Sequence, residues 1–285
     1  MTNFAAWVGR TERRVDRVDA ATLKRWCATF DRDPPVDAVP LGFHWCLCVP
    51  DAANAQLGDD GHPRRDESDT SFLPPIALPR RMWAGSSVEF HTSLKPGDDV
   101  ERVSRISSVT DKRGASGSLI FVELVHETLA NGAAAVIERQ QIVYRDAWRP
   151  GEAVAPPPLG SAAFDPEPWH MHRAKIPAEA LLFRFSALTF NAHRIHYDLP
   201  YASQREGYRG LVVHGPLTAS LLLDIAGEMV GDGRVGAFSF RGLSPALAGE
   251  TLHLVGRTGV AGIELGAFAA DGRAVMTATA TATAT

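Results

Sequence analysis

The pattern of apolar and polar positions changes period along the first half of the chain. Residues 18–30 carry apolar side chains at helical spacing, which predicts a helix with Asp19 as its N-cap and the prolines at 34–35 as its end. From Ser86 onward the apolar positions alternate, which indicates strands. The predicted strands cover residues 86–94, 100–109, 119–128 and 133–144, with turns at 96–99, at 111–118 and at Asn131-Gly132. The first half therefore predicts a helix followed by an antiparallel meander.

The segment between that helix and those strands has no clear period. Residues 41–49 form a short apolar run whose type the pattern does not settle. Residues 51–71 are polar and rich in Gly, Pro and acidic residues, which indicates a long surface loop. Residues 73–81 contain three prolines and are expected to form no regular structure, because each proline removes a backbone donor.

The second half repeats this order. Residues 176–190 resemble the first helix in pattern, and a second, strongly apolar helix is predicted at 216–230 with Pro216 at its first position. The further correspondences are 238–245 with 88–96, 248–257 with 96–105, and Asp271-Gly272 with Asn131-Gly132. The Thr/Ala alternation from Thr277 onward predicts the last strand. Because these matches occur in the same order, they indicate an internal duplication.

We therefore expect an α+β fold built from two copies of a helix wrapped by an antiparallel sheet. The predicted units are residues 1–147 and 161–285, joined by a proline-rich linker at 148–160. The first unit has no counterpart of the apolar helix at 216–230, because residues 41–81 occupy its place. We expect the chemistry to reside in the second unit and the first unit to form the walls of a ligand slot.

Composition narrows the class of protein. The 285 residues are 45% hydrophobic and 22% charged, the balance of an ordinary soluble globular protein, and the net charge of -4 argues against a nucleic-acid partner. Cys27, Cys46 and Cys48 form no even framework and lack zinc-site spacing, so three reduced thiols are expected. The N-terminal arginines precede no apolar signal segment, and no apolar run approaches the ~20 residues that span a bilayer. These features predict a cytoplasmic protein that does not bind membranes.

One stretch, residues 185–223, gathers most of the candidate chemistry. His196 can exchange a proton near neutral pH, although a lone histidine is as often a loop hydrogen-bonding group. Asn191 can orient a water or a carbonyl but cannot transfer a proton, and it could equally cap the helix that ends at Phe190. Gly215 opens the apolar helix, where its N–H could stabilise an oxyanion or where glycine could simply permit a tight corner.

Several further residues are candidates for substrate contact. Arginines beside this stretch, or at residues 80–81 in the first half, could meet a phosphate or carboxylate, or they could be ordinary surface charges. The predicted substrate contacts are His193, Arg194, His214, Arg81 and Trp83.

The residues from Phe185 to Asp198, with Gly-Leu-Val-Val-His-Gly-Pro at 210–216, resemble the hydratase motif of MaoC-like hot-dog proteins. In that motif, Asp-x-Asn-Pro-x-His is followed downstream by His-Gly at the start of the central helix. The segments 61–65 and 78–85 extend the resemblance to nearly the whole chain. They resemble the branch that contains mesaconyl-C4-CoA hydratases, itaconyl-CoA hydratases and mitochondrial 3-hydroxyacyl-thioester dehydratases.

The resemblance implies a double hot-dog fold and a hydro-lyase that reversibly hydrates a 2-enoyl thioester, with a short branched dicarboxylyl-CoA as the expected substrate. The motif histidine maps to His196, the motif aspartate maps to Asn191, and the oxyanion N–H maps to Gly215. Because an asparagine carries no proton, either His196 acts alone or a second group helps, with His193 and Asp198 nearest in sequence. The implied chemistry needs no metal or redox cofactor.

Three other activities fit the sequence less well and stay open. They are dehydration of a 3-hydroxyacyl-ACP in fatty acid synthesis, thioester hydrolysis by a hot-dog thioesterase, and non-catalytic binding of an acyl thioester. The carrier could be CoA or an acyl-carrier protein. The two hot-dog units of one chain could pair with each other. A homodimer of two chains is also compatible with the sequence.

Overall fold

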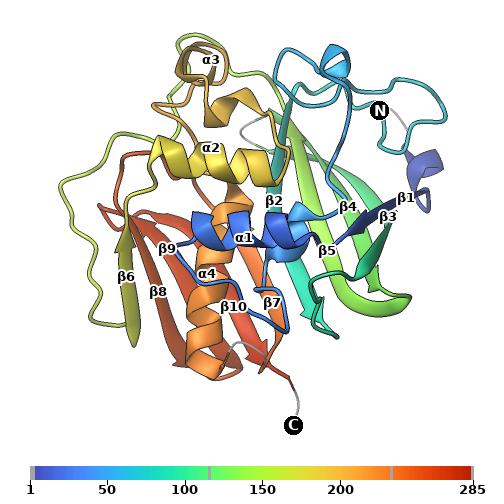
Figure 1. Ribbon diagram of the computed structural model, residues 1–285. Helices are drawn as coiled ribbons and strands as arrows, with labels where there is room; N and C mark the ends of the chain where they lie inside the picture. Colours follow the sequence, from blue (N-terminus) through green and yellow to red (C-terminus); the bar gives the residue numbers. More distant parts are fainter. Residues whose placement is uncertain (1–3, 115–116, 232–233, 284–285) are drawn as a thin grey trace.

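The computed structural model describes residues 4–114, 117–231 and 234–283. In these residues the strands form one ten-stranded antiparallel sheet in the order β1-β3-β4-β5-β2-β7-β10-β9-β8-β6 (Figure 1). The strands of the first half are β1 (Thr11–Arg17), β2 (Arg80–Phe90), β3 (Asp99–Gly114), β4 (Gly117–Ala130) and β5 (Ala133–Arg145). Those of the second half are β6 (Met171–Lys175), β7 (Val235–Gly242), β8 (Leu252–Gly259), β9 (Gly262–Ala269) and β10 (Ala274–Ala282).

Four α-helices and four 3-10 turns complete the described elements. The helices are α1 (Ala20–Thr29), α2 (Glu179–Leu188), α3 (Leu199–Gln204) and α4 (Gly215–Val230). The 3-10 turns are η1 (Ala5–Trp7), η2 (Phe43–Cys46), η3 (Asn54–Gln56) and η4 (Arg194–His196). As expected, the side chain of Asp19 caps α1 by accepting a hydrogen bond from the Thr22 N–H at 2.7 Å.

The two halves of the sheet have the same strand order. Read from the edge inward, β1-β3-β4-β5-β2 in the first half corresponds to β6-β8-β9-β10-β7 in the second. The halves join where β2 pairs with β7, and there a Cβ on Gly85 would lie 2.4 Å from the Phe240 carbonyl oxygen. This close approach explains a glycine at that position. The repeated order is the predicted duplication, and the α+β double hot-dog fold is confirmed.

Helices cover the two halves unequally. The buried face of α4 packs on β7, β8, β9 and β10 and carries leucines at 217 and 221–223. Figure 1 shows α1 and α2 side by side in front of α4, and the Trp26 and Phe185 rings join them with centroids 6.1 Å apart. Between α1 and β2, the described chain forms only η2, η3 and loops. In its described residues, the first half therefore has no second α-helix, as the sequence predicts.

The structure corrects several predicted boundaries. The prolines at 73–81 do not exclude regular structure throughout that segment, because β2 begins at Arg80. This strand ends at Phe90, before the predicted end at residue 94. The strands around residues 111–118 continue to Gly114 and restart at Gly117, so the predicted turn is shorter and its residues 115–116 lie outside the described part. The predicted helix 176–190 begins three residues later, at Glu179.

Three short elements escaped the sequence pattern. Strands β1 and β6 are the two edge strands, and most of their residues are exposed. They therefore lack the alternation of apolar and polar residues by which a strand is predicted from sequence. Helix α3 has six residues, begins at Leu199 and is capped by Asp198, whose side chain accepts from the Tyr201 N–H. The predicted last strand is β10, and residues 284–285 of the alternating tail lie outside the described residues.

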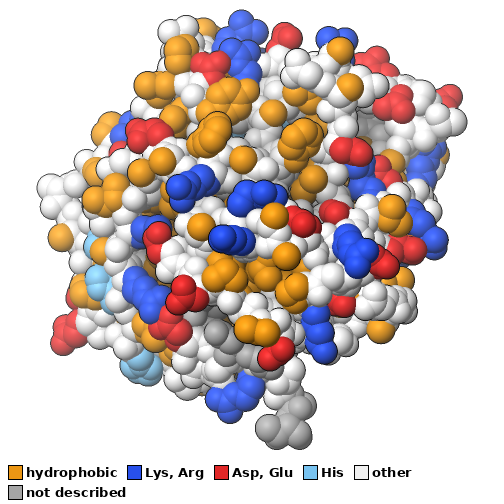
Figure 2. All heavy atoms as spheres, viewed as in Figure 1, with side chains coloured by type: hydrophobic (Ala, Val, Ile, Leu, Met, Phe, Trp, Pro, Cys, Tyr) orange, Lys and Arg blue, Asp and Glu red, His pale blue; other side chains and the backbone are white. Residues whose placement is uncertain are grey.

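The connection between the halves runs from Arg145, the end of β5, to Met171, the start of β6. The predicted unit boundaries and the linker at 148–160 stay predictions. Cys27, Cys46 and Cys48 are free and buried, as expected. No described helix is long and apolar enough to cross a membrane. Figure 2 shows acidic and basic side chains interspersed on the visible face, without a continuous basic stripe.

Candidate active site

A large cavity lies between the motif loop of the second half and the inner face of the sheet in the first half. Its volume is about 1300 Å³. One wall comes from residues 186–196 and 212–218, and the other comes from β2, β4, β5 and the loop at 61–66. A space of this size suits a large ligand. The described first half, which has no counterpart of α4, contributes one of its walls, and its role as a ligand slot stays a prediction.

Gly215 lies at the N-terminus of α4 and lines this cavity. As the first helical residue it has an N–H that no intrahelical carbonyl uses, and the helix dipole gives this end a partial positive charge. A Cβ built on Gly215 would meet no atom within 4 Å, so the residue faces open space. An N–H at this helix position can donate to the carbonyl oxygen of a ligand in the cavity.

His196 is held with a defined tautomer. Its Nδ1 lies 2.7 Å from the Val212 carbonyl oxygen, which can only accept, so Nδ1 carries the hydrogen and Nε2 has a free lone pair. Burial lowers the pKa of His196 to about 4, so the ring is neutral at pH 7. A buried neutral imidazole that lines the cavity can accept a proton through Nε2.

His214 supports His196 from behind. The two rings are stacked with centroids 3.5 Å apart, and the His214 Nε2 is hydrogen-bonded to the Ser186 hydroxyl at 2.9 Å. The His214 Nδ1 is buried without a protein partner. Burial and the neighbouring His196 hold the pKa of His214 well below its ordinary value, so this ring is also neutral.

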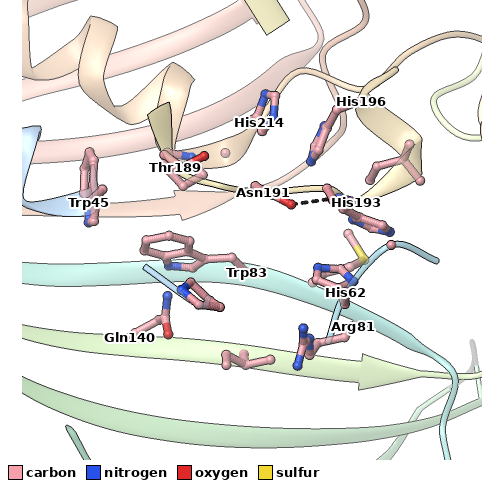
Figure 3. A pocket seen from close by; sticks show the side chains of 18 of the residues that line it. Trp45, His62, Arg81, Trp83, Gln140, Thr189, Asn191, His193, His196 and His214 are labelled. Atoms are coloured by element: carbon pink, nitrogen blue, oxygen red, sulfur yellow. Dashed lines mark hydrogen bonds between the residues drawn. The ribbon is translucent and has the colours of Figure 1, made fainter. Parts of the chain in front are cut away.

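Asn191 follows α2 in a left-handed turn. Phe190 has φ of 47°, the Asn191 N–H donates to the Ser186 carbonyl, and the Asn191 Oδ1 accepts from the His193 N–H at 2.9 Å (Figure 3). The Nδ2 donors of Asn191 remain available to a ligand, and Oδ1 keeps a second lone pair. The helix is capped at Thr189, and the Asn191 N–H helps to close its end by binding the Ser186 carbonyl, whereas the Asn191 side chain stabilises the following turn.

His193 and Arg194, neighbours in sequence, have different surroundings. His193 is buried on the cavity wall, where burial and neighbouring histidines lower its pKa far below the ordinary value. Arg194 does not line the cavity, because its guanidinium binds Asp198 at 2.6 Å and the Asp59 carbonyl at 2.9 Å. The Arg194 guanidinium is thus already bound within the protein, and its predicted substrate contact stays a prediction. Asp198 is also removed as a second proton-transfer group, because it pairs with Arg194 and caps α3.

On the opposite wall, Arg81 and Trp83 line the cavity from β2. Alternate residues of a strand share a face, so both side chains point inward. In the described part of the chain, no carboxylate lies within ion-pair distance of the Arg81 guanidinium, whereas Arg80 forms a buried pair with Glu206 at 2.6 Å. Trp83 packs edge-on against Trp45, with centroids 5.9 Å apart. This wall therefore places the Arg81 guanidinium, which has no ion-pair partner among the described residues, beside aromatic surface.

Two polar features of the site were missed by the sequence reading. The first is His62 with Asp60, whose loop lies against the motif loop, and only the resemblance of residues 61–65 hinted at it. The second is a row on β4 and β5, where His126 bonds both Ser104 and Gln140. Polar residues at inward positions of the alternating strands could have revealed this row.

Comparisons with known proteins agree with this geometry. Residues 42–248 match the family model described as hydroxyacyl-thioester dehydratase type 2. The chain is 40% identical over 286 residues to a mesaconyl-C(4)-CoA hydratase of Chloroflexus aurantiacus, covering 97% of both chains. It is 33% identical to a mitochondrial hydroxyacyl-thioester dehydratase type 2 of Schizosaccharomyces pombe, covering 80% of both.

Solved structures share the fold at low sequence identity. A MaoC-like dehydratase from Phytophthora capsici superposes with a TM-score of 0.71 at 13% identity, covering 100% of both chains. HtdX of Mycobacterium tuberculosis superposes with a TM-score of 0.69 at 18% identity, covering 96% of this chain and 100% of that chain. A further Mycobacterium tuberculosis protein, described as a double hotdog fold, gives a TM-score of 0.57 at 14% identity, covering 96% of both.

Proposed function

The chain belongs to the hydroxyacyl-thioester dehydratase type 2 family of MaoC-like double hot-dog proteins, and from this we propose that it reversibly hydrates a 2-enoyl-CoA to a 3-hydroxyacyl-CoA. The proposed acyl group is a short branched dicarboxylate, such as mesaconyl-C4-CoA or itaconyl-CoA. The name of the relative that is 40% identical supports this choice, and so does the unpaired Arg81 in the cavity.

One observation carries the proposal above the others. The cavity is lined by both a neutral histidine with a free Nε2, His196, and the N-terminus of a helix at Gly215. Hydration of an enoyl thioester needs these two functions, because water must lose a proton while negative charge develops on the thioester oxygen. An ordinary ligand-binding pocket would need neither.

The proposed reaction begins with the thioester carbonyl at the Gly215 N–H. Water, held by the Asn191 Nδ2 and the His196 Nε2, adds at C3 while its proton passes to Nε2. The electrons of the double bond move toward the carbonyl, and the helix N-terminus stabilises the resulting enolate. Delivery of a proton to C2 completes the 3-hydroxyacyl thioester, and the reverse sequence eliminates water.

The remaining parts of the substrate follow from the same walls. We propose that Arg81 meets the free carboxylate of the acyl group, because a planar guanidinium can bind both carboxylate oxygens. Trp83, His193 and His214 would bound the acyl site. The reaction as proposed is acid–base chemistry that calls for no metal or redox cofactor. We favour CoA over an acyl-carrier protein as the carrier, since the 40% identical relative is named for a CoA thioester.

Hydration is tested by following loss of the conjugated enoyl-thioester absorbance with crotonyl-CoA, mesaconyl-C4-CoA and itaconyl-CoA. We expect turnover of at least one dicarboxylyl thioester, and a loss of about 100-fold or more in His196→Ala, because general base catalysis contributes 10²–10⁴-fold. No turnover of any thioester, or full activity of His196→Ala, would contradict the mechanism. Release of free CoA without a hydrated product would instead identify a thioesterase.

We also propose that two copies of the chain can pair and that the protein is cytoplasmic. Exposed apolar side chains near the cavity entrance, such as Phe183 on α2, support pairing. Light scattering of the purified protein distinguishes a monomer from a dimer.

A further inference from the structure

The loop at residues 58–62 of the first half is fixed onto the motif loop of the second. The Arg194 N–H donates to the Asp60 carbonyl at 2.9 Å, and the Arg194 side chain binds the Asp59 carbonyl. Gly61 has φ of +86°, and a Cβ on it would lie 1.8 Å from the Ala192 carbonyl oxygen. Because only glycine fits this contact, the loop has a fixed position beside the proposed water site.

Within this loop, Asp60 orients His62. The Asp60 carboxylate accepts from the His62 backbone N–H at 3.0 Å and lies 3.0 Å from the His62 Nδ1. Burial alone would raise the pKa of Asp60, but the hydrogen bond and charge of His62 outweigh it and lower that pKa, so the carboxylate is ionised at pH 7. An ionised carboxylate only accepts, so the Nδ1 carries the hydrogen and Nε2 is left to exchange protons.

His62 lies close to the other histidines of the site. Its ring centroid is 4.1 Å from that of His193, which in turn is 5.5 Å from that of His196. Figure 3 shows these rings in succession from His196 to Arg81, with His62 on the wall opposite Asn191. His62 lines the same cavity as His196 and Gly215. A thioester between the walls would therefore have a histidine on each side.

We propose that His62, oriented by Asp60, is the second proton-transfer group of the hydration and serves C2 while His196 serves the water. This inference rests on the proposed function. His62 would transfer the proton that Asn191 cannot transfer. It belongs to the half of the molecule that lacks the hydratase motif.

The proton balance is complete with two histidines. In hydration, water gives one proton to the His196 Nε2 and its oxygen bonds to C3, while the enolate forms at Gly215. The protonated His62 then gives its Nε2 proton to C2, the C2–H bond forms, and His62 becomes neutral. Loss of the proton from His196 to solvent and uptake of one by His62 restore the pair, so the net change is addition of one water. Dehydration runs these steps in reverse.

The charges around His62 favour this role over metal binding. Ligand atoms of Asp60, His62 and His193 lie within 4.8 Å of one another, an arrangement that could hold a cation. However, burial lowers the pKa of His62 most, and the charges of Arg81 and Arg65 lower it further against the opposing effect of Asp60, so a divalent cation would meet the repulsion of two nearby guanidinium groups. A substrate carboxylate on Arg81 would neutralise that charge and favour the protonated His62 that hydration needs.

Hydration kinetics of His62→Gln provide the first test, and Gln keeps a side-chain amide near Asp60. We expect kcat to fall about 100-fold with KM within about threefold and an unchanged thermal midpoint. Asp60→Asn, a positioning change, should lower kcat about tenfold, whereas Asp59→Asn on the exposed neighbouring residue should not. If wild type is active and His62→Gln keeps kcat within threefold, the inference fails while the proposed function stands. An inactive wild type would overturn both.

Exchange of the C2 hydrogen separates the two histidines. The 3-hydroxyacyl-CoA product is incubated in D₂O, and deuterium at C2 is measured by mass spectrometry. We expect His62→Gln to lose this exchange. His196→Gln should lose dehydration but keep the exchange, because only His62 transfers the proton at C2. Equal loss of exchange in both variants would assign both transfers to His196 and overturn the proposal. If His62→Gln does not fold, the same comparison is made with Asp60→Asn.

Discussion

Two adjacent arginines on β2 differ in their partners, although both line the cavity. Arg80 is buried against Glu206, and the Arg80 guanidinium lies 5.4 Å from the centre of the Tyr208 ring. Arg81 faces the cavity beside His62 (Figure 3). Arg80 therefore belongs to the structure, whereas Arg81 is available to a ligand.

The Arg81→Gln variant should discriminate between substrates. A charge-assisted hydrogen bond contributes about 1.5–3 kcal/mol, so we expect kcat/KM for a dicarboxylyl thioester such as mesaconyl-C4-CoA to fall roughly 10- to 100-fold. Crotonyl-CoA has no carboxylate and should change less than about threefold. Arg139→Gln, on an exposed position of β5, is the control. Equal losses with both thioesters would show that Arg81 does not recognise the carboxylate.

At the scale of the elements, the position of the loop at residues 58–62 depends on one glycine, Gly61. Gly61 combines a positive φ with a carbonyl in contact, so two costs of substitution can be separated. Gly97, in the turn before β3, has φ of +93° but no atom within 4 Å of an added Cβ. It therefore reports the backbone cost alone.

We expect Gly97→Ala to lose about 1 kcal/mol of unfolding free energy, because it places alanine at positive φ, and Gly61→Ala to lose more, because its Cβ would also clash with the Ala192 carbonyl. Only Gly61→Ala must also move the loop away from Ala192, so only this variant should lose more than about tenfold in hydration kcat. Urea unfolding and initial-rate assays on the two variants check this. Wild-type activity in Gly61→Ala would mean that the loop position does not matter for turnover.

At the scale of the whole molecule, the sequence predicted those elements whose apolar pattern spans many residues or recurs in both halves. The helices at α1 and α4, the meander and the repeated order could be predicted because apolar periodicity spans many residues. The edge strands β1 and β6 could not, since most of their residues are exposed. His62 could not be placed either, because its contact with His193 joins positions more than a hundred residues apart in a polar loop without period.

The cluster of histidines around the cavity should make the unfolding free energy depend on pH. His62, His193, His196 and His214 all have lowered pKa values, and desolvation by burial is the largest cause for each. In the unfolded chain each histidine takes up a proton near pH 6.5, but the folded His196 does so only near pH 4. The unfolded state therefore binds more protons between these values, and the unfolding free energy falls as pH drops below 6.5.

Urea unfolding at pH 7, 6 and 5 measures this dependence. His196 alone should account for roughly 2 kcal/mol of the loss between pH 7 and pH 5, since one pKa unit corresponds to about 1.4 kcal/mol. In His196→Gln that share disappears, so the decline should be shallower than in the wild type. His91→Gln, which changes a partly exposed histidine, should follow the wild-type curve. Parallel curves for wild type and His196→Gln would mean that His196 titrates normally in the folded protein, and the neutral base at the centre of the mechanism would have to be abandoned.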